Sequence, residues 1–339
     1  MIRIGKYCGL IVLLGLFSGA GAQDINFSQF YELPMLRNPA LAGVHRCDVR
    51  VTAAYRNQWN SVTVPYKTTA LGGEMKFGVS NGSSDHVSIG LMITNDIAGD
   101  SRLGKTQFFP GITYHKQLNN DENTFLSAGF MGGPVFQRFD PSKLAFDDQF
   151  VNGAYSPTNP TRQVFANQDY TYWDIAAGLS LRSMLAADVY YYIGAAYFHP
   201  TRPKVAFLET NDVRLNRKFV VNAGLTAYTG DFDRVTLYAD YFTQGGNGQA
   251  QGGIMYRHDL LQVDEEESIA ISGGAFIRWR DALVPMIKLD YYKLGIGLTY
   301  DVNISKLSVA SQARGGFELT LTYLGCLNIR RSMPCPVTF

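Results

Sequence analysis

The stretch from Leu294 to Tyr323 alternates apolar and polar side chains in two runs that a polar loop separates. A period of two places successive side chains on opposite faces of a β-strand. One face carries glycine, hydroxyl and acidic side chains, typical of a lumen, and the other suits contact with lipid, so the pattern predicts a transmembrane β-barrel. The apolar face consists of Leu294, Ile296, Leu298, Tyr300, Val302, Ile304, Phe317, Leu319, Leu321 and Tyr323.

The same alternation recurs along most of the chain and predicts an all-β fold, a transmembrane outer-membrane β-barrel of about 14 antiparallel strands. The alternative is a soluble β-sandwich, whose strands are usually shorter, about 5–6 residues. Pro110 is expected to interrupt pairing, because proline has no N–H to donate. The predicted strands are 48–57, 65–77, 86–96, 103–117, 123–137, 171–185, 188–199, 217–228, 234–243, 249–258, 267–278, 282–291, 294–303 and 315–324.

The connections between these strands support the same topology. With both chain ends in the periplasm, odd-numbered connections face outward, where barrels of this class have their longer loops. The longest connection is the fifth, Phe139–Asp169, and the seventh (200–216) and thirteenth (304–314) are also long. Two connections fit less well: the tenth (259–266) is long and acidic for a turn, and the eleventh (279–281) is short for a loop.

Residues 1–22 have the organisation of a secretory signal peptide. Arg3 and Lys6 precede an apolar run, and Ala20-Gly21-Ala22 fits the small-residue cleavage rule, so the mature chain is expected to begin at Gln23. The apolar run is too short to span a bilayer as a helix, which needs about 20 residues. The expected parts are the signal peptide (1–22), an N-terminal segment or plug (23–47), the barrel (48–324) and a periplasmic C-terminal tail (325–339).

Charges of both signs are expected in the lumen, where pairing limits their desolvation cost. We therefore expect a lumen that is not a wide empty channel. The segment from 23 to 47 either plugs this lumen or lies along the rim or in the periplasm. The candidate inward charges are Arg50, Arg56, Glu74, Lys76, Asp174, Arg182, Asp240, Lys288, Asp290, Asp301 and Glu318.

The charge and the aromatic content of the chain limit the kinds of partner that it is expected to bind. The signal peptide holds two basic residues and no acidic ones, which leaves 28 basic against 29 acidic residues in the mature chain. A nucleic-acid partner is not expected, because it would require a basic face. The 20 Tyr and 21 Phe residues suit the aromatic girdles of a barrel in outer-membrane lipid.

Three cysteines remain after cleavage, namely Cys47, Cys326 and Cys335. An exported chain meets an oxidising compartment, and all three cysteines are expected on the periplasmic side. We favour a disulfide between Cys335 and either Cys47 or Cys326, with three free thiols as the alternative. No metal site is expected, because no histidine accompanies the cysteines at a recognisable spacing.

No catalytic constellation stands out. A lipase would need a serine, a histidine and an orienting side chain near the lipid boundary, and no serine here has a distinctive context. The glycine runs 245–248 and 252–253 flank a predicted strand, whereas a phosphate-binding loop opens a helix. We expect no catalytic, cofactor-binding or metal-binding residues and therefore no enzymatic activity.

Short motifs follow one another in a fixed order along nearly the whole mature chain. They are QDINFSQFY (23–31), NPALAG (38–43), YRNQW (55–59), PY (65–66), RPK (202–204), RKFVV (217–221), YDVN (300–303), GGFEL (315–319) and CP (335–336). In order and spacing they resemble the PorP/SprF family of outer-membrane proteins, which belongs to the type IX secretion and gliding motility systems of Bacteroidota. The final Cys335-Pro336 is followed by three residues, whereas phenylalanine often comes sooner in the family.

The resemblance implies a non-enzymatic barrel that is needed for the secretion or cell-surface anchoring of exported proteins. The implied partners are a secreted cargo or adhesin C-terminal domain, and periplasmic ring or peptidoglycan-associated lipoproteins. The alternative is a transport channel for hydrophobic or small polar solutes, since the fatty-acid transporters also carry a plug with an element like Asn38-Pro39-Ala40. In the fifth connection, the candidates for a partner-binding surface are Phe146, Phe150, Tyr155 and Phe165.

Overall fold

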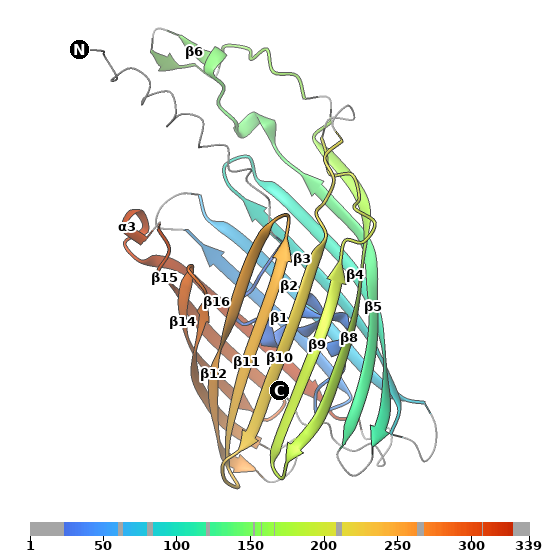
Figure 1. Ribbon diagram of the computed structural model, residues 1–339. Coiled ribbons are helices and arrows are strands. Elements are labelled where there is room, and N and C mark those ends of the chain that lie inside the picture. Colours follow the sequence, from blue (N-terminus) through green and yellow to red (C-terminus); the bar gives the residue numbers. More distant parts are fainter. Residues whose placement is uncertain are drawn as a thin grey trace, which may run out of the picture.

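The computed structural model describes residues 24–59, 64–79, 84–119, 123–151, 153–156, 158–165, 167–207, 212–262, 268–306 and 308–327. Within these residues, fourteen strands form a closed antiparallel barrel, which the pairing of β1 with β16 completes (Figure 1). The predicted fold class is therefore confirmed. The barrel strands are β1 (Val49–Gln58), β2 (Tyr66–Gly78), β3 (His86–Ala98), β4 (Leu103–Asn119), β5 (Thr124–Arg138), β8 (Asp169–Ala186), β9 (Val189–Phe198), β10 (Lys218–Tyr228), β11 (Asp233–Gln244), β12 (Asn247–Gln262), β13 (Ser268–Arg278), β14 (Ala282–Tyr291), β15 (Leu294–Asn303) and β16 (Arg314–Gly325).

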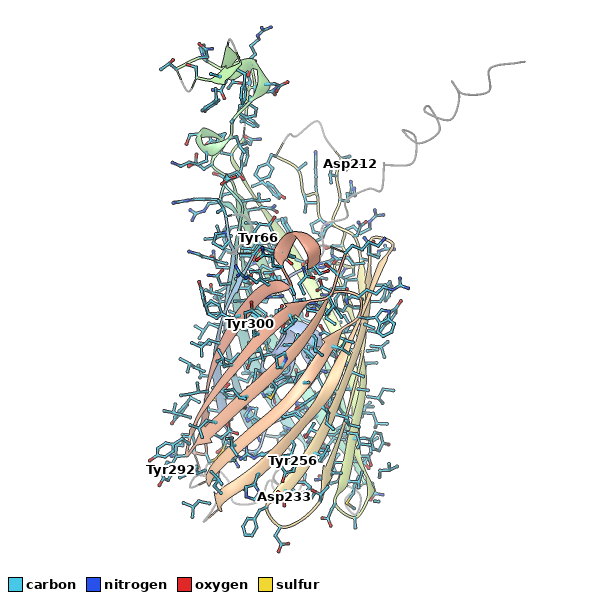
Figure 2. All side chains as sticks on the ribbon, turned by 90° about the vertical axis from the view of Figure 1, so that its left-hand side faces the viewer. Tyr66, Asp212, Asp233, Tyr256, Tyr292 and Tyr300 are labelled. Atoms are coloured by element: carbon cyan, nitrogen blue, oxygen red, sulfur yellow. A yellow bond between two sulfur atoms is a disulfide. The ribbon has the colours of Figure 1, made fainter. Side chains whose placement is uncertain are left out.

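The two faces of the strands differ as the alternation predicts. On β16, Leu321 is 49% exposed, whereas its neighbour Thr320 is 1% exposed. On β8, Trp173 is 70% exposed and Asp174 is 2% exposed. Apolar side chains thus point outward all round the wall, which makes the β-sandwich alternative wrong. The labelled tyrosines lie toward both ends of this wall (Figure 2): Tyr66, Tyr300, Tyr256 and Tyr292.

The long connections gather at one end of the barrel, here called the loop end, and tight turns join the strands at the other, the turn end (Figure 1). Because outer-membrane barrels carry their long loops outside, the loop end faces the exterior. The fifth connection contains η3 (Pro141–Lys143), η4 (Asp147–Gln149) and the paired strands β6 (Phe150–Val151) and β7 (Ala154–Tyr155). This hairpin was not predicted, because two-residue strands are too short to show alternation. The short helix α3 (Ser308–Ser311) also lies at the loop end.

Pro110 interrupts pairing on only one side of its strand. Strand β4 pairs with β3 straight through Pro110, which lies opposite Leu91. Pairing with β5 stops after Gln107 and resumes at Gly111. A proline can remain in a barrel strand where the neighbouring ladder tolerates a gap, so the sequence expectation holds for one neighbour.

Residues 24–47, here called the inner segment, lie inside the barrel (Figure 1). The segment folds into three short helices, η1 (Phe30–Glu32), α2 (Pro34–Arg37) and η2 (Pro39–Leu41). Phe30 and Phe276 pack edge to face with their ring centres 5.6 Å apart, and the stacked rings of Tyr31 and Tyr238 are 5.3 Å apart. None of the helices in the described ranges is long and apolar enough to cross a membrane.

Candidate functional site

The inner segment is bound to the barrel wall near its first residues by two acidic side chains. The backbone N–H groups of Ser28 and Gln29 donate to the two carboxylate oxygens of Glu318, at 2.6 and 2.9 Å. The Ser28 hydroxyl donates to Asp301 at 2.6 Å. Arg56 joins this cluster through Asp301 (2.8 Å) and Glu318 (3.0 Å). Lumen charges of opposite sign therefore hold the inner segment as well as each other.

Arg37 is the central charged contact of the inner segment. Its guanidinium donates to the two carboxylate oxygens of Asp240 on β11, at 2.6 and 2.9 Å, and to the Tyr192 hydroxyl at 2.7 Å. All three side chains are buried. A bidentate arginine–carboxylate pair has a strong preference for this geometry, and it fixes α2 against β9 and β11.

Two inward glycines leave room for the turn that follows Arg37. The Asn38 amide donates to the backbone carbonyls of Leu179 (3.0 Å) and Ala195 (3.3 Å). A Cβ added at Gly178 would lie 1.9 Å from Asn38 Oδ1, and one at Gly129 would lie 2.4 Å from the Pro39 carbonyl carbon. The strands can approach the inner segment this closely only because these positions have no side chain.

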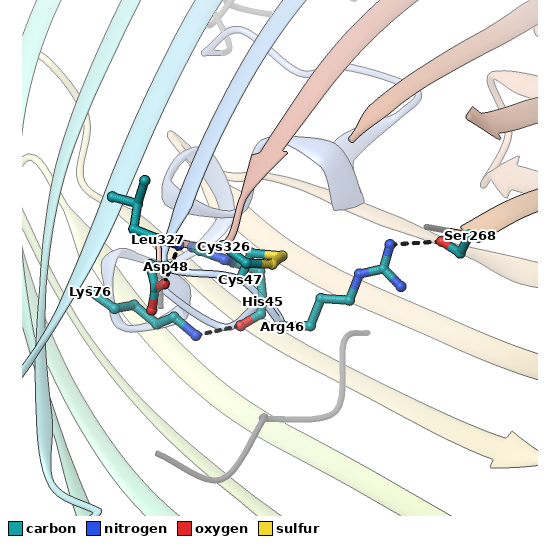
Figure 3. Close-up of a disulfide and its surroundings, with 8 residues drawn as sticks. All are labelled: His45, Arg46, Cys47, Asp48, Lys76, Ser268, Cys326 and Leu327. Carbon is teal, nitrogen blue, oxygen red and sulfur yellow. Dashed lines mark hydrogen bonds between the residues drawn. A yellow bond between two sulfur atoms is a disulfide. The ribbon is translucent and has the colours of Figure 1, made fainter. Parts of the chain in front are cut away.

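A disulfide joins Cys47 to Cys326, with the two Cα atoms 4.4 Å apart (Figure 3). The favoured pairing with Cys335 is wrong. Strand β1 pairs with β16 so that Val49 lies opposite Gly325, and this register brings the cysteines just outside the two strands together. Cys335 itself lies outside the described residues. The disulfide ties the end of the inner segment to the seam that closes the barrel.

Further contacts hold the inner segment at the turn end. The Gly43 N–H donates to Glu74 at 2.6 Å, and Glu74 also binds Arg50 at 2.8 Å. Lys76 donates to the His45 carbonyl at 2.7 Å, and Arg46 reaches the Ser268 hydroxyl at 3.2 Å (Figure 3). The inner segment is thus held here from β2 and from β13, two strands that are not neighbours in the barrel.

At the loop end, the contacts of Asp24 fix the start of the described chain. Asp24 and Asp174 each lie 2.6 Å from a different ring nitrogen of His199, which follows β9. Burial lowers the pKa of His199, but the two carboxylates outweigh burial and raise it to about 9. The imidazolium therefore donates to both acids at neutral pH. Lys105 adds an ion pair with Asp24 at 3.2 Å.

The structure brings most of the predicted inward charges into pairs. Ten of the eleven are buried, and Lys288, the eleventh, has a side chain that is 16% exposed. Among the described residues Arg182 makes no ion pair, and its guanidinium packs over the Phe125 ring at 4.2 Å. The sequence did not indicate the ion-pair partners that are absent from the predicted set, namely Glu32, Arg37, His199, Arg257 and Arg278.

The aromatic residues of the fifth connection form small local contacts. Phe165 lies near Phe146, with ring centres 5.7 Å apart, and edge-on to Phe139 at 5.3 Å. Phe150 and Tyr155 face each other across the β6–β7 hairpin at 5.7 Å and are 54% and 42% exposed. The loop therefore presents exposed aromatic side chains at the end of the barrel that faces the exterior.

The chemistry of these contacts is that of binding. Over the described ranges, no three His, Cys, Asp or Glu side chains are arranged to hold a metal ion. Buried hydrogen bonds, ion pairs and apolar packing hold the inner segment against the wall.

Three comparisons place the chain among known proteins. Among solved structures, the toluene transporter TodX of Pseudomonas putida is 8% identical with a TM-score of 0.47, over 89% of this chain and 95% of TodX. A FadL homologue of Pseudomonas aeruginosa is 11% identical with a TM-score of 0.46, over 84% and 92% of the two chains. Similarities this remote carry no argument about what this chain binds.

No curated protein sequence matches the chain. The family described as "Type IX secretion system membrane protein PorP/SprF" matches residues 20–323, which covers the inner segment and nearly the whole barrel. An outer-membrane barrel is also what the closed fold and its apolar outer face require. The chain therefore belongs to the PorP/SprF family of type IX secretion system membrane proteins.

Proposed function

We propose that this protein is a non-enzymatic barrel that supports the secretion or surface anchoring of exported proteins by binding a partner. The observation that carries the proposal is the way the lumen is filled. Charges that would line a conducting pore are instead used to hold the inner segment, as in the contacts of Arg37 with Asp240 and of Ser28 with Glu318. A barrel filled in this way serves better as a docking platform than as a pore.

The two ends of the barrel suggest different partners. At the loop end, the exposed aromatic residues of the fifth connection offer the kind of side chain that anchors protein interfaces. We propose that a secreted cargo or adhesin C-terminal domain binds there. At the turn end, periplasmic ring or peptidoglycan-associated lipoproteins are the proposed partners, by analogy with the family.

Deletion of residues 145–164 tests the role of the loop end. The deletion removes the β6–β7 hairpin and should reduce surface display of cargo while leaving the barrel folded, because these residues lie outside the barrel ladder. A matched control deletes residues 305–313, which form the thirteenth connection at the same end. Unchanged secretion and display of all cargo after the first deletion would rule out the loop as a partner surface.

Purification under mild detergent tests the choice between partner binding and transport. One large exported protein or periplasmic lipoproteins that co-purify with the chain support the proposal. Fatty acid or detergent bound in the lumen, together with high ion conductance of the purified barrel, would support the alternative of a transport channel for hydrophobic or small polar solutes.

A further inference from the structure

A cavity of about 70 Å³ lies at the turn end, between the inner segment and the barrel wall. Inner-segment residues form one side of it, and inward residues near the turn ends of β11, β12 and β14 form the other. Its lining contains more positive than negative side chains. The cations are Arg46, Arg50, Arg234, Arg257 and Lys288, and the carboxylates are Glu32 and Asp290.

The carboxylates near this cavity are already shared with cations. Lys288 binds Glu32 at 2.5 Å, and Arg257 binds both Asp290 and Asp259. Arg50 is paired with Glu74, which lies outside the lining. Each carboxylate of the lining is therefore already paired with a cation.

Arg234 differs from Arg50, Arg257 and Lys288, which are all ion-paired. In the described part of the chain it forms no ion pair, and its guanidinium donates to the Tyr228 hydroxyl at 3.5 Å and lies 5.7 Å from the centre of the Tyr228 ring. The side chain is half-buried and lines the cavity. Because no carboxylate among the described residues neutralises Arg234, its positive charge can attract an anion into the cavity.

Several polar atoms of the lining residues also have no hydrogen-bond partner among the described residues. They include the hydroxyls of Tyr31 and Tyr238 and Nε of Arg50. The phenols and the guanidinium can donate, so a ligand that satisfies them must accept hydrogen bonds. Buried polar groups in folded proteins nearly always have a partner, so these atoms mark the cavity as a site for a polar ligand.

Burial is the main cause that lowers the pKa of two inner-segment residues beside the cavity, and neighbouring cations act in the same direction. Burial lowers the pKa of His45 well below its usual range, and the nearby charges of Arg50 and Lys76 lower it further. Burial also lowers the pKa of Arg46, and Arg257 contributes in the same direction. His45 is therefore neutral at pH 7 and adds no charge to the five cations.

We propose that this cavity binds a phosphate group, either free or as the end of a phosphomonoester, through Arg234, Arg46 and the phenols of Tyr31 and Tyr238. A cavity needs roughly 10–15 Å³ to hold one water molecule. The volume of about 70 Å³ is therefore large enough for one small oxyanion. Guanidinium groups match the oxygens of phosphate and carboxylate equally well in geometry. Phosphate is favoured because its four oxygens can accept hydrogen bonds from two guanidinium groups and two phenols together, whereas a carboxylate has only two oxygens.

Calorimetric titration of the purified mature barrel in a non-ionic detergent at low salt tests the proposal, with inorganic phosphate and then glycerol 3-phosphate as the probes. We expect saturable binding at one site per chain. Arg234→Gln should weaken it about tenfold or more, because a hydrogen bond to a charged group is lost. Tyr238→Phe keeps the ring and should weaken binding by a smaller factor. The probe that binds more tightly distinguishes a free phosphate from an ester.

Arg214→Gln is the matched control, because it removes the same charge from an exposed residue at the loop end that pairs with Asp212. Equal weakening by Arg214→Gln and Arg234→Gln would overturn the proposal, since binding would then follow overall charge. Absence of saturable binding at millimolar phosphate would overturn it as well.

Discussion

The guanidinium of Arg37 and the carboxylate of Asp240 form a buried bidentate pair, with N···O distances of 2.6 and 2.9 Å between residues 203 positions apart in the chain. This pair attaches the inner segment to β11. Removal of one partner leaves the other charge buried without a counter-ion, which typically costs about 3–5 kcal/mol. We expect Arg37→Met to lower the free energy of unfolding by about this amount, as measured by urea titration of the folded barrel in lipid.

The double variant Arg37→Met/Asp240→Leu serves as the control for this prediction. Removal of both charges leaves no unpaired ion, so the double variant should be more stable than Arg37→Met alone. If the double variant loses as much stability as the sum of the two single changes, the pair is not coupled in the way the geometry indicates.

The close approach at Gly129 predicts a second outcome. Gly129→Val would bring a side chain against the Pro39 carbonyl carbon, 2.4 Å from an added Cβ. Overpacking of this kind typically costs about 1–3 kcal/mol, and we expect the inner segment to loosen from the wall. Trypsin should then cleave after Arg37, and single-barrel conductance should rise.

Gly73→Val is the matched control for Gly129→Val. Gly73 lies on β2, and an added Cβ there meets nothing within 4 Å. Cleavage after Arg37 should stay at the level of the unmodified protein. Equal cleavage in both variants would show that any valine in a strand loosens the segment, whatever its position.

The disulfide leads to a third prediction. Cys47→Ser should remove the Cys47–Cys326 bridge and lower the stability of the folded barrel by about 2–4 kcal/mol, the usual range for a disulfide. Non-reducing electrophoresis of the unfolded protein reports the bridge, because the crosslinked chain is more compact. Cys335→Ser should leave mobility and stability unchanged, and a loss of the compact form in Cys335→Ser would contradict the observed pairing.

The strands were predictable because alternation is a local property of the sequence. The apolar side chain of Leu321 and the polar side chain of Thr320 indicate by themselves which face of the strand each residue occupies. No distant partner is needed to assign them. The register across the barrel seam is not local. Cys47 meets Cys326 only because β1 pairs with β16. A periplasmic location common to all three cysteines does not reveal this pairing, and the favoured bridge to Cys335 was wrong.

The inner segment shows the same limit. Its contacts join residues far apart in the chain, as between Arg37 and Asp240 or Ser28 and Glu318, and no periodicity indicates such pairs. The sequence does hold one relevant signal, the glycines at inward strand positions such as Gly129 and Gly178. In the structure these mark where the wall contacts the Asn38–Pro39 turn. From the sequence alone they are equally consistent with bends in the strands.

The last prediction concerns pH. His199 lies outside the strands and its pKa is raised to about 9, because Asp24 and Asp174 outweigh the effect of burial. In the unfolded chain the pKa of histidine is about 6.5. The stabilisation is therefore complete below about pH 6.5 and is lost as the pH rises through about 9, where the imidazolium loses its proton.

We therefore expect thermal stability of the barrel, followed by heat-modifiable migration in electrophoresis, to fall between pH 7 and pH 10. In His199→Gln this part of the fall should disappear, because glutamine keeps a hydrogen bond without a titrating proton. The contact that weakens is the one that holds Asp24 at the loop end, so proteolysis of the chain near Asp24 should increase over the same pH range. An identical pH profile in the variant and the unmodified protein would exclude His199 as the group responsible.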